Sequence, residues 1–136
     1  MSNEIGFEVQ LDQPYEVAIE SVVSALKAEG FGVLTKIDVR ETIKEKLGEE
    51  FRPYAILGAC NPPLAHRALI SDPSVGLMLP CNVTVEALPD RNSLVRIANP
   101  EAMLQTGALQ ESSTLKPVAK EARVKLERVA AALLEL

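Results

Sequence analysis

The residues of this chain best able to do chemistry are its two cysteines, each followed by an asparagine: Cys60-Asn61 and Cys81-Asn82. A thiolate is a nucleophile and a soft metal ligand, and an asparagine amide both donates and accepts hydrogen bonds. Two prolines follow Asn61, a pattern typical of a helix start with Asn61 as the N-cap. The sulfur of Cys60 would then lie near unpaired backbone N–H groups, whose partial positive charge favours a thiolate.

A structural role fits both cysteines as well. Cys60 ends an apolar run over residues 54–60, and free cysteine is among the most buried residue types. Cys81 directly follows Pro80 in a β-rich segment, so it is either a small core residue or a residue that a break in the strand turns toward a pocket. Spacing alone leaves these alternatives open.

A soft-metal site is a third possibility. Cys60, Cys81 and the single histidine, His66, are soft or borderline ligands, although the chain lacks the paired CxxC motifs of zinc sites. His66 lies off the apolar face of its predicted helix, so we expect it at the rim of the fold. The candidate metal ligands are Cys60, His66 and Cys81. The candidate ligand-binding residues are these three together with Asn61 and Asn82.

Catalytic and nucleotide-binding motifs are missing from the sequence. It contains no Gly-x-Ser-x-Gly nucleophile elbow and no GxxxxGK[ST] phosphate loop, and Gly30-Phe31-Gly32 lacks the third glycine of a dinucleotide-binding turn. A relay of the Ser-His-Asp type would have to use His66, the one histidine. The sequence therefore predicts neither a hydrolase nor a nucleotide-dependent enzyme, and it indicates no particular cofactor.

Composition predicts one globular domain over residues 1–136, with 47% hydrophobic and 24% charged residues. The net charge of −5 and the absence of tryptophan disfavour nucleic-acid binding. No apolar run reaches the length of about 18 residues that a membrane span needs, and the first residues do not resemble a signal peptide. We therefore expect a cytoplasmic protein without a membrane partner.

Hydrophobic periodicity predicts the elements that position the two Cys-Asn motifs. Alternating or continuous apolar residues predict five strands, over residues 7–11, 32–37, 54–60, 75–88 and 93–98. Pro80 interrupts the strand predicted over 75–88. Apolar stripes and capping residues predict helices over about 14–29, 39–47, 62–71 and 100–106, and from about 114 to the end. Asp12 is the predicted N-cap of the first of these helices. Helices of crossover length are too few for a doubly wound sheet, so we predict an α+β fold with helices on one face of a mostly antiparallel sheet.

Three blocks of the sequence closely resemble the family catalogued as domain of unknown function 302. They are residues 29–39, 53–69 and 76–83, and the likeness extends over roughly residues 6–130. It implies a TATA-box-binding-protein-like fold, with a curved antiparallel sheet packed on helices, and a homodimer. The family has no assigned activity, so no catalytic residues carry over. Its motif residues correspond to Cys60, Asn61, Pro62, His66, Cys81 and Asn82, whereas Lys36 departs from the acidic residue of many relatives.

Three functions follow as hypotheses. The first is a homodimeric module that binds a small molecule or a soft metal near the two Cys-Asn motifs. The second is a structural or interaction protein without chemistry, which dimerises through an exposed strand edge or its final helix. The third is a thiol redox protein in which Cys60 is the reactive thiolate and Cys81 resolves it as a disulfide.

Overall fold

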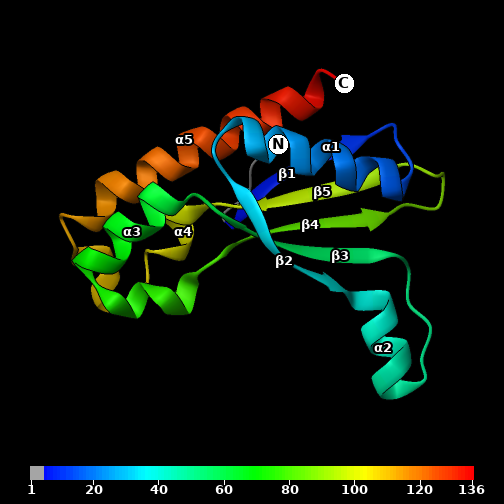
Figure 1. Cartoon of the computed structure of the whole chain (residues 1–136), viewed down its shortest axis with the longest axis horizontal. Coiled ribbons are helices and arrows are strands. Elements are labelled where there is room, and N and C mark those ends of the chain that lie inside the picture. Colours follow the sequence, from blue (N-terminus) through cyan, green and yellow to red (C-terminus); the bar gives the residue numbers. More distant parts are fainter. Residues whose placement is uncertain (1–4) are drawn as a thin grey trace.

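The computed structural model describes residues 5–136, which form a five-stranded sheet and a set of helices (Figure 1). The strands are β1 (Gly6–Leu11), β2 (Gly32–Asp38), β3 (Tyr54–Cys60), β4 (Cys81–Ala87) and β5 (Ser93–Ala98). The helices are α1 (Tyr15–Ala28), α2 (Val39–Leu47), α3 (Pro62–Ser71), α4 (Pro100–Met103) and α5 (Leu115–Leu134), with 3₁₀ turns η1 (Pro73–Met78) and η2 (Gly107–Glu111). Within residues 5–136, no helix is both long and apolar enough to span a bilayer.

The sheet is open and antiparallel throughout. Its strand order is β1-β5-β4-β3-β2, so β1 and β2 are the edges. Helices α1 and α5 lie over one face, and no helix of residues 5–136 covers the opposite face (Figure 1). The structure confirms the predicted α+β class.

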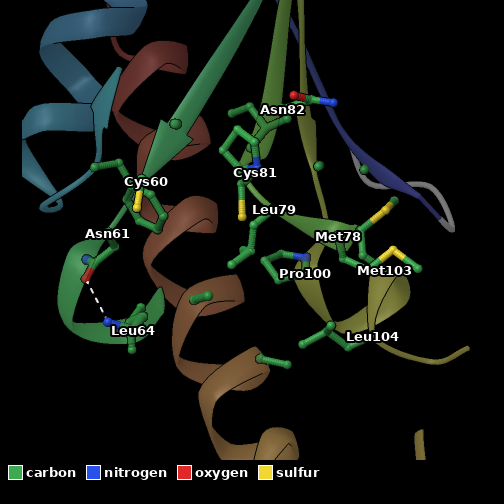
Figure 2. Close-up of a pocket in the computed structure, with 18 of the residues that line it drawn as sticks. Cys60, Asn61, Leu64, Met78, Leu79, Cys81, Asn82, Pro100, Met103 and Leu104 are labelled. Atoms are coloured by element: carbon green, nitrogen blue, oxygen red, sulfur yellow. Dashed lines mark hydrogen bonds between the residues drawn. The ribbon is translucent and has the colours of Figure 1, made fainter. Parts of the chain in front are cut away.

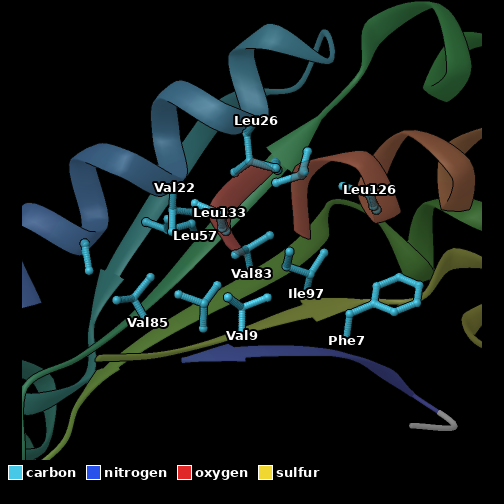
Figure 3. Packing of buried hydrophobic residues seen from close by; sticks show 14 of the residues in the cluster. Phe7, Val9, Val22, Leu26, Leu57, Val83, Val85, Ile97, Leu126 and Leu133 are labelled. Atoms are coloured by element: carbon cyan, nitrogen blue, oxygen red, sulfur yellow. The ribbon is translucent and has the colours of Figure 1, made fainter. Parts of the chain in front are cut away.

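Side chains on the helix-covered face form the main core (Figure 3). Successive side chains of a strand point to opposite faces, so every second residue is apolar and buried. The strand members of this core are Phe7, Val9, Leu11, Ala55, Leu57, Ala59, Val83, Val85, Val95 and Ile97. Val22 and Leu26 of α1 and Leu126, Val129 and Leu133 of α5 pack on them, at the spacings that place residues on one face of a helix.

A second, smaller core holds α3 and η1 against the first half of α5. Its buried members are Leu64, Ala68, Val75, Leu115, Val118 and Ala122. We call α3, η1, α4 and the first half of α5 the end lobe, because they lie beyond one end of the sheet (Figure 1). The chain enters this lobe directly from β3 and leaves η1 directly into β4.

Side-chain caps start three helices where the sequence predicts them. The carboxylate of Asp38 accepts a hydrogen bond from the backbone of α2, and the amide oxygens of Asn61 and Asn99 do the same for α3 and α4. The prediction that Asp12 caps α1 is wrong. That helix begins at Tyr15, so the cap position falls on Pro14, whose side chain has no acceptor.

The predicted strand over residues 75–88 is too long. Residues 73–78 form η1, in which Val75 is buried in the smaller core, and β4 begins only at Cys81. Asp72 accepts a hydrogen bond from the backbone N–H of Ser74 at 2.9 Å and so stabilises the start of the 3₁₀ turn. A short turn that buries one apolar residue, as η1 buries Val75, looks like part of a strand in the sequence, which explains the error.

Candidate functional site

A cavity of about 560 Å³ lies between the ends of the strands and the end lobe (Figure 2). Most of the groups that line it are apolar, and the lobe provides many of them. They include Leu64 of α3, Met78 and Leu79 at the end of η1, and Pro100, Met103 and Leu104 at α4. This size and lining are typical of sites for small organic molecules.

The structure brings both Cys-Asn motifs to the wall of this pocket (Figure 2). β3 ends at Cys60 and β4 begins at Cys81, and the two strands are neighbours in which Ala59 lies opposite Cys81. The intervening residues form α3 and η1, which line another side of the same cavity. The two cysteines therefore lie near each other at one end of the β3–β4 pair, which their spacing in the sequence left open.

The two thiols occupy different surroundings. Cys81 lies on the helix-covered face, as Ala59 does, and packs against the main core. Cys60 follows Ala59 in β3, so its side chain leaves the strand on the opposite face of the sheet. Both cysteines are free and half-buried. Burial, and to a lesser extent the neighbouring Cys60, raises the pKa of Cys81 to about 11. Cys81 is therefore a neutral thiol near pH 7, unlike the thiolates of metal and redox sites.

Asn61 uses both ends of its amide inside the fold. Its Oδ1 accepts a hydrogen bond from the backbone N–H of Leu64 at 3.3 Å, and its Nδ2 donates one to the backbone oxygen of Glu29 at 3.3 Å. The residue is buried. Asn61 therefore ties the start of α3 to the end of α1 and positions the pocket wall. Asn82 is exposed and lies opposite Gly58 in the ladder.

His66 does not join the other predicted residues. It is exposed on α3 and lies outside the pocket lining. Leu64 and Ala68 face inward one turn apart, and a residue two positions after Leu64 points roughly the opposite way around the helix. In the described part of the chain, no three His, Cys, Asp or Glu residues are placed to hold a metal ion. The predicted metal set of Cys60, His66 and Cys81 is therefore not assembled.

Because Gly58 has no side chain, Thr35 and Pro80 can approach β3 closely beside the two cysteines. A Cβ built there would lie 2.2 Å from Oγ1 of Thr35 and 2.8 Å from Cγ of Pro80. Pro80, which follows a cis peptide bond, thus packs directly on β3, next to the first residue of β4. This contact holds the entry into β4 against β3 and shapes the wall that carries Cys81.

The open face of the sheet adds polar residues that sequence reasoning missed. Glu8, Arg96 and Thr84 lie opposite one another on β1, β5 and β4, and all three line the pocket. Arg96 donates from Nε to Oε2 of Glu8 at 3.2 Å. Alternation with core residues in the sequence does mark Arg96 and Thr84 as facing away from the core. That signal cannot distinguish a pocket from plain solvent exposure.

Glu86 is a buried carboxylate next to this polar region. Its side chain is only 6% exposed, and it accepts hydrogen bonds from Arg52 and Arg96. Burial alone would raise the pKa of Glu86, but the hydrogen bonds and charges of the two arginines hold it below its usual value. The carboxylate stays ionised at neutral pH, and its charge offsets that of the guanidinium groups around it.

Comparison with known proteins agrees with this architecture. The family described as Domain of unknown function DUF302 matches residues 7–133. The chain belongs to the DUF302 family. Among solved structures, it is similar to an uncharacterized conserved protein DUF302 from Bacillus stearothermophilus, with 31% sequence identity, a TM-score of 0.78 and 94% of each chain covered. No curated protein matches the chain. The resemblance seen in the three sequence blocks is therefore confirmed.

Proposed function

We propose that this DUF302 protein binds a small, mainly apolar molecule in the pocket between the strand ends and the end lobe. The observation that carries the proposal is the cavity itself, about 560 Å³ and lined largely by apolar side chains. Ligand sites usually have volumes of about 300–1,000 Å³ and combine apolar walls with a few polar groups. Both Cys-Asn motifs lie on that wall, as expected for a site that uses them as part of its shape.

Binding fits the two thiols better than redox chemistry or a metal does. A metal would need Cys81 as a thiolate ligand, and the redox hypothesis needs it as the resolving thiolate, so the raised pKa of Cys81 opposes both roles. Half-buried thiols are, however, well suited to contact an apolar ligand, since a free cysteine packs as a small polarizable hydrophobe. We therefore assign Cys60 and Cys81 to the pocket wall and leave metal binding as an outcome of the test.

Titration with 1-aminoanthracene, an uncharged fluorescent probe, tests this proposal. Ala65 of α3 lines the pocket, whereas the adjacent His66 is exposed outside it, so Ala65→Trp and His66→Trp form a matched pair. We expect saturable binding of one probe per chain, weakened at least about tenfold by Ala65→Trp and unchanged by His66→Trp. The absence of saturable binding, or equal binding by both variants, would refute the proposal. Native mass spectrometry of untagged, reduced protein also reports any co-purified molecule or metal.

A second proposal concerns the segment formed by β2 and α2, which we call the arm. β2 is an edge of the sheet. α2 projects from the sheet and has no buried residue (Figure 1). The arm exposes large apolar side chains: Leu34 at 68%, Ile37 at 48% and Leu47 at 70%. Exposed edges and apolar patches of this kind are usually covered by a partner.

We propose that a second copy of the chain covers the arm. Pairing of two β2 edges would cover Leu34 and Ile37 of both copies and so remove exposed apolar surface from water. Size-exclusion chromatography with light scattering should show a dimer that Ile37→Lys dissociates. Ile70→Lys, at an apolar site on α3 that is 70% exposed against 48% for Ile37, should leave the dimer intact. A monomeric parent protein, or dissociation by both variants, would contradict this interface.

A further inference from the structure

The pocket has two chemically distinct ends, and we infer that its ligand is an uncharged amphipathic carbonyl compound, such as a medium-chain amide. Its apolar body would lie in the end lobe, and its carbonyl oxygen would accept hydrogen bonds from Thr84 and Arg96. This inference rests on the proposed binding function and specifies the class of ligand. Three observations carry it: the division of the lining, the state of the Thr84 hydroxyl and the charge balance around Arg96.

The lining divides by structural element. The end lobe provides side chains without charge or strong hydrogen-bonding groups, among them Met78, Leu79, Met103 and Leu104. The open face of the sheet provides the polar row of Glu8, Arg96 and Thr84 from three adjacent strands. A ligand that fills both ends must therefore be apolar over most of its length and polar at one end.

Thr84 carries a hydroxyl that the fold does not use. Its Oγ1 is buried and has no hydrogen-bond partner among the described residues. Valine has nearly the same shape and is favoured in strands, so internal packing gives no reason for a hydroxyl here. Ile56, opposite Thr84 on β3, offers it no side-chain acceptor. Rotation about χ1 exchanges the positions of Oγ1 and the methyl group, which would let the hydroxyl meet a ligand in the pocket.

The charges around Arg96 favour a neutral head group. Its Nε donates to Glu8 and its Nη1 to Glu86, and Glu86 is shared with Arg52. Both guanidinium groups are therefore already paired with carboxylates. A ligand carboxylate would meet a cation already paired and would lie beside Glu8, whereas a carbonyl oxygen needs only a donor. Arg96 has five N–H groups, of which these two bonds use two, so it can still donate.

Isothermal titration with octanamide and octanoate tests the inference, because the two probes share a chain and differ in head-group charge. We expect the parent protein to bind octanamide at least about tenfold more tightly than octanoate at pH 7.5. Thr84→Val should weaken octanamide binding about five- to tenfold, and Thr84→Ser should restore most of it. His66→Trp, at an exposed residue outside the pocket lining, should leave the affinity for octanamide unchanged.

The outcomes separate this inference from the proposed function. If 1-aminoanthracene binds but octanoate equals or exceeds octanamide, the pocket is a binding site and the inference about its head group is wrong. The same holds if Thr84→Val binds octanamide as the parent does, or if octanamide does not bind. If neither the dye nor octanamide binds, both proposals fail. Thermal unfolding of Thr84→Val controls for misfolding, and we expect a midpoint no lower than that of the parent.

Discussion

Burial raises the pKa of the Cys81 thiol to about 11, with a smaller contribution from Cys60, and this makes its chemistry predictable. Only the thiolate reacts with iodoacetamide, so raising the pKa from the model-compound value of 9.0 lowers the reactive fraction at pH 8 about 100-fold. In a Cys60→Ala protein, we expect the labelling rate of Cys81 to increase about tenfold per pH unit between pH 7.5 and 9.5. A rate that rises only about threefold or less between pH 8.5 and 9.5, with the circular dichroism unchanged, would show an ordinary or activated thiol instead.

Gly58 is a residue at which an added methyl group should disturb the pocket wall. Its Cβ would overlap Oγ1 of Thr35 and Cγ of Pro80, so β2 or the entry to β4 must move. We expect Gly58→Ala to lower the free energy of unfolding by about 1–3 kcal/mol, measured by urea denaturation. Gly32→Ala is the matched control, since a Cβ there meets nothing within 4 Å. Equal effects of the two substitutions would contradict this account of Gly58.

At the scale of elements, the start of α3 links the sheet to the end lobe. Asn61 caps this helix and also binds the backbone of Glu29, so its loss removes two hydrogen bonds at a buried site. We expect Asn61→Ala to destabilise the protein by about 1–2 kcal/mol and to weaken probe binding, because α3 forms part of the pocket.

The effect of Asn61→Ala can be compared with that of another cap. Asn99 caps the shorter helix α4 with one side-chain bond, to the backbone N–H of Glu101 at 3.0 Å. Asn99→Ala should therefore cost less, about 0.5–1 kcal/mol in the same urea titration. A larger loss of stability for Asn99→Ala than for Asn61→Ala would show that the bond to Glu29 contributes little.

At the scale of the whole molecule, the helix of the arm has little support from the rest of the chain. α2 buries no residue of its own, so its backbone hydrogen bonds should open easily in an isolated chain. If a second copy covers the arm, amide hydrogen exchange in β2 and α2 should slow as protein concentration rises through the dimer dissociation constant, while exchange in β4 stays constant. Exchange in the arm that is independent of concentration, in a protein shown to dimerise, would place the interface elsewhere.

The sequence alone determines much of the local structure of this protein, because the relevant forces act over a few residues. Alternation identifies β1, since one face of the strand must be buried, and an apolar run identifies β3. Asparagine or aspartate before α2, α3 and α4 marks their starts, since a side-chain oxygen there accepts an otherwise unpaired backbone N–H. Where two local signals compete, as between η1 and a strand around Val75, the sequence misleads.

The tertiary structure alone decided which of the candidate residues meet. Cys60 and Cys81 come together because β3 and β4 pair, whereas His66 is directed to solvent by the face of α3 that packs on α5. Thr84, Arg96 and the lobe methionines carry no motif, and they share a pocket only because the strand order and the lobe place them there. A cavity depends on contacts between segments distant in the chain, and such contacts leave no periodic pattern in a single sequence. Local chemistry therefore predicted the elements, and long-range packing made the site.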